Sequence, residues 1–402
     1  MRVFLVAGEP SGDRLGGAVM AGLRALRPDV TFDGIGGETM AAEGLRSRFP
    51  MSDLSVMGLV EVLGRYRLLR RRLDETIQAV LDSRPDILLT IDSPDFGLRV
   101  AKAVKQAGAG VHCVHYVAPT IWAWRSGRAR KLRGVVDQLL ALFPFEPPLW
   151  EAQGVPCDFV GHPVVAEPVA TQAEAEAFRG AFGLGDAPLV LALPGSRRSE
   201  VERLAPRFGE ALGRLVAARP GTRIVLPAAT PVADLVKEVT ASWSVKPVVL
   251  VPRPDPLAQS MKRAAFKAAD VALAASGTVS LELAASGTPM VIAYDMAWLS
   301  WQVLTRMVRL ETVTLVNIVS GTRAVPEFLG PACRPGPIAE ALARVMEAPG
   351  AQAEAMRLTM ERLGQGGEPP GLRAARAILT RCEDQAARAI QPPPSTRVPS
   401  GA

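Results

Sequence analysis

The sequence contains few of the residues that build metal centres and disulfide frameworks. Its 402 residues include only four cysteines and three histidines. The cysteines have no paired spacing, which indicates reduced thiols and argues against a zinc site. Three histidines are also too few for a histidine-rich metal centre. These counts argue against a bound metal, and we also predict no cofactor.

The chain also lacks long apolar runs. No stretch approaches the roughly twenty consecutive apolar residues that a membrane-spanning helix needs. The apolar start, from Arg2 to Ala7, is too short for a signal peptide, and Glu9 and Asp13 follow it closely. We therefore expect a cytoplasmic protein.

Signatures of nucleic-acid binding are missing as well. The sequence has no helix-turn-helix, zinc-finger or RNA-binding motif, although Lys and Arg exceed Asp and Glu by 46 to 40, a net charge of +6. Part of this excess lies in one short segment that contains Arg65, Arg67, Arg70, Arg71 and Arg72. Such a cluster predicts an anionic partner. We expect a phospholipid surface or a phosphorylated substrate, and no nucleic acid.

This basic segment has two interpretations. From Val56 to Arg72 apolar residues recur at helical spacing, and arginines fill many of the other positions. A helix of this kind can lie on anionic lipid head groups. It can equally be an ordinary surface helix with one face in the core and its arginines in water. The sequence leaves both interpretations open.

Apolar runs of strand length alternate with amphipathic helical stretches along most of the chain. This alternation predicts parallel sheets with helices on both faces. It pauses in an Ala-, Glu- and Pro-rich stretch at 163–186, where we place a linker. The predicted fold class is therefore α/β, with two Rossmann-like doubly wound domains at 1–165 and 186–336. The sequence does not decide whether the helices expected at about 340–389 return to the first domain, and the proline-rich tail at 391–402 is predicted to be disordered.

The stretch 271–294 predicts a strand, a tight turn, a short helix and a second strand. The turn contains Ser276, Gly277 and Thr278. A helix that begins there directs unpaired backbone N–H groups, and the positive end of its dipole, at an anion. Glu282, about one turn into the helix, can accept hydrogen bonds from sugar hydroxyls, so we predict a nucleotide site. The alternative is that the turn only caps the helix and Glu282 is solvated.

A second anion site is predicted at the turn Gly195-Ser196-Arg197-Arg198. This turn follows an apolar strand, and Ser199 with Glu202 predicts a capping box at the start of the next helix. The forked guanidinium of arginine suits phosphate oxygens. We therefore expect Arg197 to bind phosphate.

A glycine-rich loop follows the first strand of the chain. It contains Glu9, Ser11 and Asp13 but lacks the Gly-Lys-Ser/Thr of a Walker sequence, so it gives little support to an ATPase. Ligands of open α/β sheets bind at the carboxyl ends of the strands. We expect the two carboxylates of this loop at that edge.

Asp92 ends another apolar strand, predicted at 86–92. A carboxylate in this position is well placed to act as a general base, and we assign that role to Asp92. The alternative is that Asp92 or Asp95 caps the helix predicted at 97–107. In the second domain Asn317 is a polar residue close to the end of an apolar run, and we expect it to face a cleft between the domains.

Six short strings, taken in their order, resemble the lipid-A-disaccharide synthase family of GT-B glycosyltransferases. The resemblance covers nearly the whole chain except the proline-rich tail, and the joint order of the strings is very specific. One departure is Pro10, where the family often has threonine. The strings are Val6-Ala-Gly-Glu-Pro-Ser-Gly-Asp13, Val56-Met-Gly-Leu-Val-Glu-Val-Leu63, Ile91-Asp-Ser-Pro-Asp-Phe96, Ile121-Trp-Ala-Trp-Arg125, Leu193-Pro-Gly-Ser-Arg197 and Ala275-Ser-Gly-Thr278.

The resemblance implies an inverting glycosyltransferase of lipid A biosynthesis. Its substrates would be UDP-2,3-diacylglucosamine and 2,3-diacylglucosamine 1-phosphate (lipid X), and its products a β(1→6)-linked disaccharide 1-phosphate and UDP. The two domains would face a cleft, as in other GT-B enzymes, and need no metal. The protein would lie peripherally on the cytoplasmic face of the inner membrane, and it could form a homodimer.

The resemblance also gives roles to individual residues. Asp92 matches the catalytic aspartate of the family and would be the base, with Glu9 as a supporting carboxylate near the acceptor or sugar. The remaining candidates would bind substrate or UDP. Arg197 and the turn at 276–278 would bind the diphosphate, and Glu282 would bind the ribose. Asn317 would contact a nearby part of the donor, and Ser11 would contact the substrate.

Two other functions remain open at this stage. A GT-B UDP-sugar 2-epimerase would use carboxylates in the cleft but no lipid surface. A two-domain sugar-phosphate binding protein would close on its ligand and consume nothing. Product analysis with and without an acceptor separates these possibilities.

Overall fold

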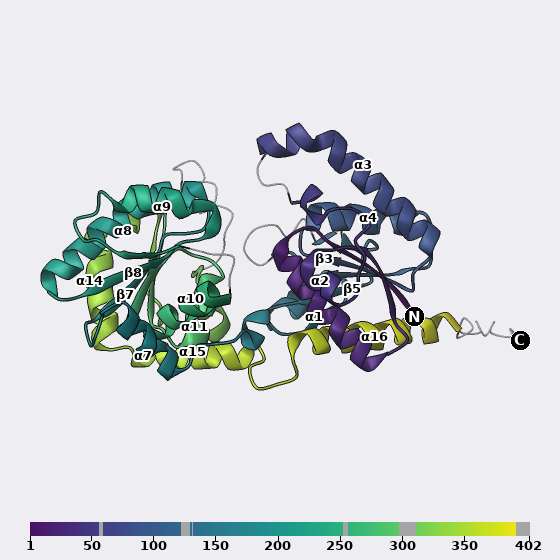
Figure 1. Cartoon of the computed structure of the whole chain (residues 1–402). Helices are drawn as coiled ribbons and strands as arrows, with labels where there is room; N and C mark the ends of the chain where they lie inside the picture. The colour runs from purple at the N-terminus through teal and green to yellow at the C-terminus, as the bar shows by residue number, and fades with distance from the viewer. Residues whose placement is uncertain (56–58, 122–128, 131, 252–255, 297–310, 391–402) are drawn as a thin grey trace, which may run out of the picture. The chain divides into compact units, whose positions relative to one another are not determined.

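The computed structural model describes residues 1–55, 59–121, 129–130, 132–251, 256–296 and 311–390. The chain forms two compact units, one of Met1–Pro163 with Gly367–Ala402 and the other of Val164–Gly366 (Figure 1). The first change of unit therefore falls at the start of the stretch in which the sequence predicts a linker. The tail at 391–402, predicted to be disordered, lies outside the described residues.

The first unit is built on a six-stranded sheet in the order β2-β1-β3-β4-β5-β6. Every adjacent pair of strands is parallel. The strands β3, β4 and β5 are buried along their whole length, as expected for a parallel sheet with helices on both faces. The strands are β1 (Arg2–Ala7), β2 (Thr31–Ile35), β3 (Ile87–Ile91), β4 (His112–Tyr116), β5 (Gln138–Ala141) and β6 (Cys157–Phe159).

Helices cover both faces of this sheet (Figure 1). The helices α3 (Leu59–Ser83) and α4 (Pro94–Gln106) share one core with alternate strand residues, and α1 (Pro10–Leu26) and α16 (Pro370–Ile390) share the other. Shorter helices are α2 (Glu38–Ala42), η1 (Met51–Asp53) and α6 (Glu146–Glu151).

The last helix returns to the first unit through a close contact with α1. A side chain on Gly22 would meet the carbonyl oxygen of Gly371 at 2.7 Å, and one on Gly371 would meet the carbonyl oxygen of Ala18 at 2.5 Å. The two glycines therefore allow the helix backbones to approach each other directly. Of the segment 340–389, only α16 lies on the first unit, because the preceding helices belong to the second.

The second unit has a six-stranded parallel sheet in the order β12-β11-β10-β7-β8-β9. Its strands are β7 (Leu189–Leu193), β8 (Arg223–Pro227), β9 (Val248–Leu250), β10 (Val271–Ala274), β11 (Met290–Tyr294) and β12 (Glu327–Leu329). Its helices include α7 (Gln172–Ala181), α8 (Arg198–Ala218), α9 (Ala233–Thr240), α10 (Pro256–Ala268), α11 (Val279–Ser286), α13 (Leu315–Ser320), α14 (Pro335–Glu347) and α15 (Gly350–Arg362).

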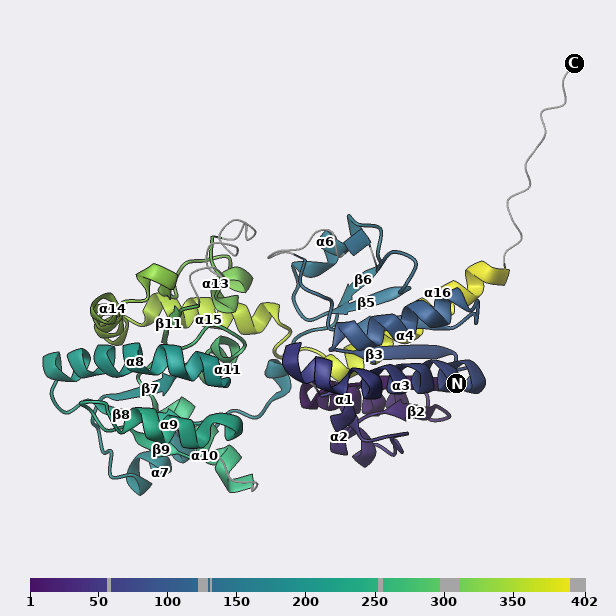
Figure 2. The same ribbon diagram turned by 90° about the horizontal axis from the view of Figure 1, so that it is seen from above.

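The helices α8, α9 and α14 share one core with alternate residues of the strands, and α10 and α11 lie on the other side of the sheet (Figures 1 and 2). The predicted fold class, two doubly wound parallel sheets, is thus confirmed.

Each sheet has one point at which the direction of strand addition reverses. In the first unit the chain adds β2 on one side of β1 and then β3 on the other. In the second unit it adds β8 and β9 on one side of β7 and then β10 on the other. Crevices at such switch points, beyond the carboxyl ends of the strands, are where open α/β sheets bind ligands. The candidate residues can therefore be judged by their distance from these two points.

Candidate active site

Asp92 and Ser11 meet at the switch point of the first sheet. Asp92 directly follows β3, and Ser11 lies in the first turn of α1, which begins just after β1. The hydroxyl of Ser11 donates to Oδ2 of Asp92 at 2.8 Å. Both side chains are partly exposed. The positive dipole ends of α1 and α4 lie next to this carboxylate, a favourable setting for its negative charge.

The backbone around Asp92 is strained. Four described non-glycine residues have a positive φ, and three of them lie at the ends of β3 and β4: Asp92 at +54°, Ser93 at +32° and Val117 at +77°. A conformation of this kind costs about 1–3 kcal/mol per residue and persists only where its surroundings enforce it. The amide of Asp92 donates to the carbonyl of Tyr116 at 2.9 Å, and that of Val117 to the carbonyl of Leu140 at 3.1 Å. Hydrogen bonds to adjacent strands thus hold this turn in its strained conformation. Strain concentrated at the ends of strands is typical of a functional site.

Neither aspartate next to α4 caps that helix. The helix begins at Pro94, three residues earlier than predicted, and its N-cap is Ser93. Asp95 is exposed in the first turn. The capping alternative for Asp92 and Asp95 is therefore wrong, and the side chain of Asp92 is directed to Ser11.

Asp13, which we expected at the carboxyl edge of the sheet together with Glu9, has a structural role. Its two carboxylate oxygens accept from the backbone amides of Gly37, Thr39 and Met40 at 2.7–3.1 Å. Asp13 is buried. It holds the start of α2 against α1, so its carboxylate binds backbone amides at this edge and not a ligand.

Glu9 is the N-cap residue of α1 and is half-buried. It lies two residues before Ser11, at the start of the helix that carries the hydroxyl to Asp92. This position is compatible with the supporting role predicted for it, which stays a prediction.

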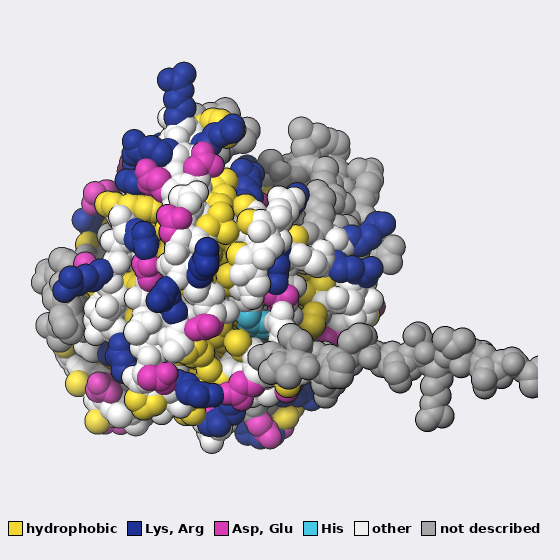
Figure 3. Space-filling view, turned by 90° about the vertical axis from the view of Figure 1, so that its right-hand side faces the viewer, with side chains coloured by type: hydrophobic (Ala, Val, Ile, Leu, Met, Phe, Trp, Pro, Cys, Tyr) yellow, Lys and Arg dark blue, Asp and Glu magenta, His cyan; other side chains and the backbone are white. Residues whose placement is uncertain are grey.

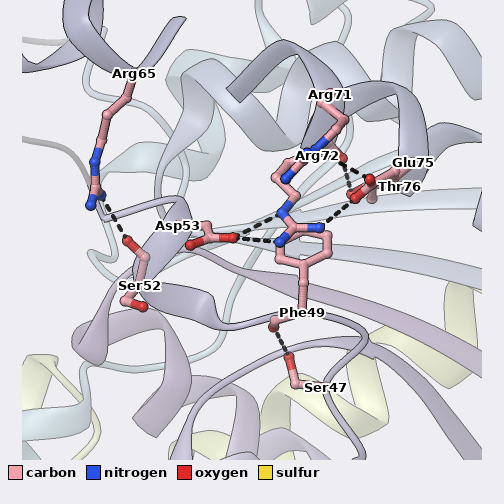
Figure 4. Close-up of polar contacts among 9 residues, drawn as sticks. All are labelled: Ser47, Phe49, Ser52, Asp53, Arg65, Arg71, Arg72, Glu75 and Thr76. Atoms are coloured by element: carbon pink, nitrogen blue, oxygen red, sulfur yellow. Dashed lines mark hydrogen bonds and ion pairs between the residues drawn. The ribbon is translucent and has the colours of Figure 1, made fainter. Parts of the chain in front are cut away.

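Ser55, which the sequence did not single out, holds the end of β1. Its hydroxyl donates to the carbonyl of Gly8 at 2.6 Å. The segment before it is fixed by Asp53, whose carboxylate accepts from Nε of Arg72 on α3 at 2.8 Å (Figure 4). The loop that carries Glu9 is thus linked to α3 through Ser55 and Asp53.

Arg72 differs from the other arginines of the basic segment. Its guanidinium also donates to Oε2 of Glu75 at 2.7 Å, and its Cζ lies 4.5 Å from the ring centre of Phe49 (Figure 4). The side chain of Arg72 is only 18% exposed. Its neighbours Arg70 and Arg71 are exposed. Arg72 therefore anchors α3, and only the other arginines are available to an anionic partner.

The predicted turn at 276–278 lies at the switch point of the second sheet. Gly277 has a φ of +150°, and a side chain there would meet nothing within 4 Å, so the backbone is open to a ligand. Gly277 and Thr278 are exposed and lead into α11, whose N-cap is Thr278. The alternative that the turn caps the helix through a side chain is not supported, because the Thr278 side chain makes no cap hydrogen bond.

The turn at Arg197 lies beside it, because β7 and β10 are adjacent and Leu193 is in register with Ala274. The predicted capping box of Ser199 and Glu202 is wrong. The helix α8 begins at Arg198, and Glu200 accepts from the amides of Ser196 and Arg197 at 3.1 and 3.3 Å.

This capping changes what the turn can offer to an anion. The carboxylate of Glu200 already accepts from two backbone amides of this turn. The group that attracts an anion here must therefore be the Arg197 guanidinium. That side chain is 68% exposed and lies 3.3 Å from Glu200. Arg197 is therefore accessible to phosphate oxygens next to the 276–278 turn.

Glu282 is also at this switch point, in the first turn of α11. Its Oε2 lies 2.7 Å from Nζ of Lys262 on α10, a residue that the sequence did not single out. Glu282 is thus not simply a solvated helix residue.

Asn317 does not have the open position predicted for it. It lies within α13 and is 2% exposed. Its Nδ2 donates to the carbonyl of Val325 at 2.9 Å, and its Oδ1 accepts from the amide of Val325 at 3.0 Å. The side chain therefore holds a backbone segment together, and we assign it no contact with the donor.

Two general features complete the description. None of the helices in the described part of the chain is long and apolar enough to cross a membrane. Within the same residues no three His, Cys, Asp or Glu side chains are grouped so that they could hold a metal ion.

Comparisons with known proteins agree with this arrangement. The model of a protein family described as lipid-A-disaccharide synthetase matches residues 3–374. The chain belongs to this family. It is 63% identical over 383 residues to a lipid-A-disaccharide synthase of Ruegeria pomeroyi, covering 95% of both chains. It is 48% identical over 382 residues to one of Rhodospirillum centenum, covering 94% of both.

Family membership makes this lipid-A-disaccharide synthase homologue a glycosyltransferase of lipid A biosynthesis, a hexosyltransferase that acts on UDP-sugar and lipid substrates. The solved structures confirm its GT-B-like fold. A UDP-GlcNAc 2-epimerase from Neisseria meningitidis has a TM-score of 0.63 at 13% identity, with 96% of this chain and all of the other covered. A putative UDP-N-acetylglucosamine 2-epimerase from Listeria monocytogenes has a TM-score of 0.61 at 14% identity, with 96% and 97% covered.

Proposed function

We propose that this family member transfers 2,3-diacylglucosamine from UDP to the 6-hydroxyl of 2,3-diacylglucosamine 1-phosphate, with inversion at the anomeric carbon. The products are the β(1→6)-linked disaccharide 1-phosphate and UDP. The observation that carries this proposal is the hydrogen bond between Ser11 and Asp92 at the switch point of the first sheet. It orients a carboxylate at the edge where ligands bind.

Asp92 is the proposed general base. Ser11 donates to Oδ2, and Oδ1 is the oxygen proposed to accept the proton from the 6-hydroxyl of the acceptor. The resulting oxygen nucleophile attacks the anomeric carbon of the donor as the bond to the diphosphate breaks. A single displacement inverts that carbon, and a positioned base contributes typically about 10²–10⁴-fold to such a step.

The leaving diphosphate is the second part of the proposal. Its negative charge is stabilised by the open start of α11 at Gly277 and by the exposed guanidinium of Arg197. Glu282 accepts from the ribose hydroxyls of the same nucleotide. The start of α11 and the Arg197 guanidinium supply this positive charge without a metal ion.

The test is direct product analysis. Purified protein is incubated with both substrates, and UDP and the disaccharide are quantified in the same samples. We expect equal amounts of the two products. An incubation with donor alone is the control, and a change at C2 of the donor sugar would instead show a UDP-sugar 2-epimerase. Binding of UDP-diacylglucosamine without any product would indicate a binding protein.

For the cellular location, we propose peripheral association with the cytoplasmic face of the inner membrane through α3. Its first half carries exposed Arg65, Arg67, Arg70 and Arg71, and Tyr66 is 53% exposed. Figure 3 shows basic side chains at the top of the molecule, where α3 lies, with hydrophobic side chains exposed near them. Basic and apolar groups on one helix match an anionic lipid surface. Homodimer formation stays a prediction from the sequence.

A further inference from the structure

Lys262 joins two helices beside the nucleotide site of the second unit. It lies on α10, and its Nζ donates to Oε2 of Glu282 on α11 at 2.7 Å. The same ammonium lies 5.1 Å from the ring centre of Phe266, which is buried. The ring and the carboxylate together restrict where the ammonium can lie, and the ammonium in turn restricts Glu282.

The pair is accessible to a ligand. The side chain of Lys262 is 42% exposed and that of Glu282 is 35% exposed. An ionised carboxylate can accept about four hydrogen bonds through its two oxygens. Lys262 uses Oε2, so Glu282 can still accept from the two neighbouring hydroxyls of a ribose without breaking the ion pair.

The charge of Lys262 also suits this position. A carboxylate close to a nucleoside diphosphate repels it, and an ammonium 2.7 Å away offsets that repulsion. Glu282 can then contribute hydrogen bonds for the ribose at a smaller electrostatic penalty for the diphosphate.

We propose that Lys262 is a positioning residue for nucleotide recognition, which holds the carboxylate of Glu282 toward the ribose diol of UDP. This inference rests on the proposed function, because Glu282 must be the ribose contact. It goes further by naming the group that makes Glu282 selective for a ribose with both hydroxyls. Lys262 itself acts through Glu282.

The same helix supplies a matched control. Lys267 also lies on α10 and reaches α11, but its Nζ lies 3.4 Å from the carbonyl oxygen of Ser286, at the other end of that helix. Replacing Lys267 removes a charge and a contact between the same two helices without touching Glu282. A general weakening of the α10–α11 contact would affect both lysine variants alike.

The experiment measures the dissociation constants of UDP and 2′-deoxy-UDP by titration calorimetry. The proteins are the unaltered chain, Glu282→Gln, Lys262→Met, Lys262→Arg and Lys267→Met, each checked for an unchanged melting midpoint. We expect the unaltered chain to prefer UDP about tenfold, the equivalent of one good hydrogen bond. Lys262→Met should bind UDP more weakly and lose most of that preference, as should Glu282→Gln. Lys262→Arg and Lys267→Met should keep it.

The outcomes separate the two claims. If Glu282→Gln loses the preference while Lys262→Met keeps it, Glu282 is the ribose contact and the role of Lys262 is refuted. If Lys262→Met weakens UDP and 2′-deoxy-UDP equally, the lysine acts on the diphosphate alone and the positioning role is also refuted. If the unaltered chain binds no UDP, the proposed function fails and the inference fails with it.

Discussion

The hydroxyl of Ser11 lies 2.8 Å from Oδ2 of Asp92, although the two residues are 81 positions apart in the chain. Two consecutive features bring them together. The strands β1 and β3 are adjacent and parallel, with Ala7 in register with Ile91, so the residues that follow them emerge at one edge. The helix α1 then begins at once, at Pro10, and places Ser11 over that edge. This hydrogen bond from a hydroxyl to a carboxylate orients the Asp92 side chain and leaves its other oxygen, Oδ1, available to act as a base.

Ser11→Ala should lower the turnover rate by about tenfold, since a hydrogen bond to a charged group contributes roughly 1.5–3 kcal/mol and water replaces part of it. The Michaelis constant for the UDP-sugar should change little, because Ser11 acts on the base. Steady-state kinetics with each substrate varied in turn measures this. An unchanged turnover rate would show that Ser11 does not orient Asp92.

Arg197→Met should raise the Michaelis constant for the UDP-sugar by about tenfold or more, since a charge-assisted contact to phosphate is lost. Its melting midpoint should stay unchanged because the side chain is mostly exposed. The next residue offers the control. Arg198 is 71% exposed and pairs with Glu202 on the surface of α8, so Arg198→Met should leave the kinetics nearly unaltered. If both variants raise the Michaelis constant equally, Arg197 has no specific role in binding the UDP-sugar.

Replacing Arg67, Arg70 and Arg71 together by serine should weaken binding to anionic vesicles. Each basic residue near such a surface contributes about 1 kcal/mol. Co-sedimentation with vesicles of phosphatidylglycerol and phosphatidylethanolamine, at two salt concentrations, measures the loss and its expected screening.

Arg72→Met is the counterpart for the same helix. It should lower the melting midpoint, because Arg72 bonds Asp53 and Glu75 and packs on Phe49 (Figure 4). Vesicle binding of the folded protein should change less than in the triple variant. If the triple variant sediments with vesicles as the unaltered chain does, α3 is an ordinary surface helix.

Two buried histidines should make the chain less stable in mild acid. Burial lowers the pKa of His115 and of His162 from 6.5 to about 4. Between these values the unfolded chain binds a proton at each position and the folded chain does not, so the free energy of unfolding falls as the pH falls from about 6.5 to about 4. Each histidine contributes at most about 1.4 kcal/mol per pH unit in that window. Urea titrations at several pH values measure the slope, which His162→Gln should reduce.

The fold could be predicted from the sequence because it depends on local patterns. Apolar runs such as Leu189–Leu193, each followed by a turn and an amphipathic helix, were sufficient to predict two doubly wound sheets. Candidate residues that directly follow strands, Asp92 and Gly277, were found for the same reason. The ends of strands can be recognised in a sequence, and the switch points of these sheets lie at the ends of strands.

The errors share a different cause, which is partner choice. The sequence placed Asp13 at the ligand-binding edge of the sheet but did not show that its partners are amides of a loop more than twenty residues away. Glu202 had the spacing of a capping residue, yet Glu200 makes the contacts. Asn317 and Lys262 were misjudged or missed because their partners, Val325 and Glu282, become neighbours only in the folded unit. The burial and the partners of polar side chains depend on tertiary packing. The spacing of residues in a single sequence does not predict that packing.

The central claim is that Asp92 removes the proton from the acceptor hydroxyl, and one comparison tests it most directly. The rate of disaccharide formation and the dissociation constant of UDP are measured for the unaltered chain and for Asp92→Asn. The asparagine keeps the size of the side chain and its contact with Ser11 but cannot take the proton. We predict that the rate falls by about 10²–10⁴-fold while the affinity for UDP stays the same. An Asp92→Asn protein that forms the disaccharide at the full rate would contradict the account.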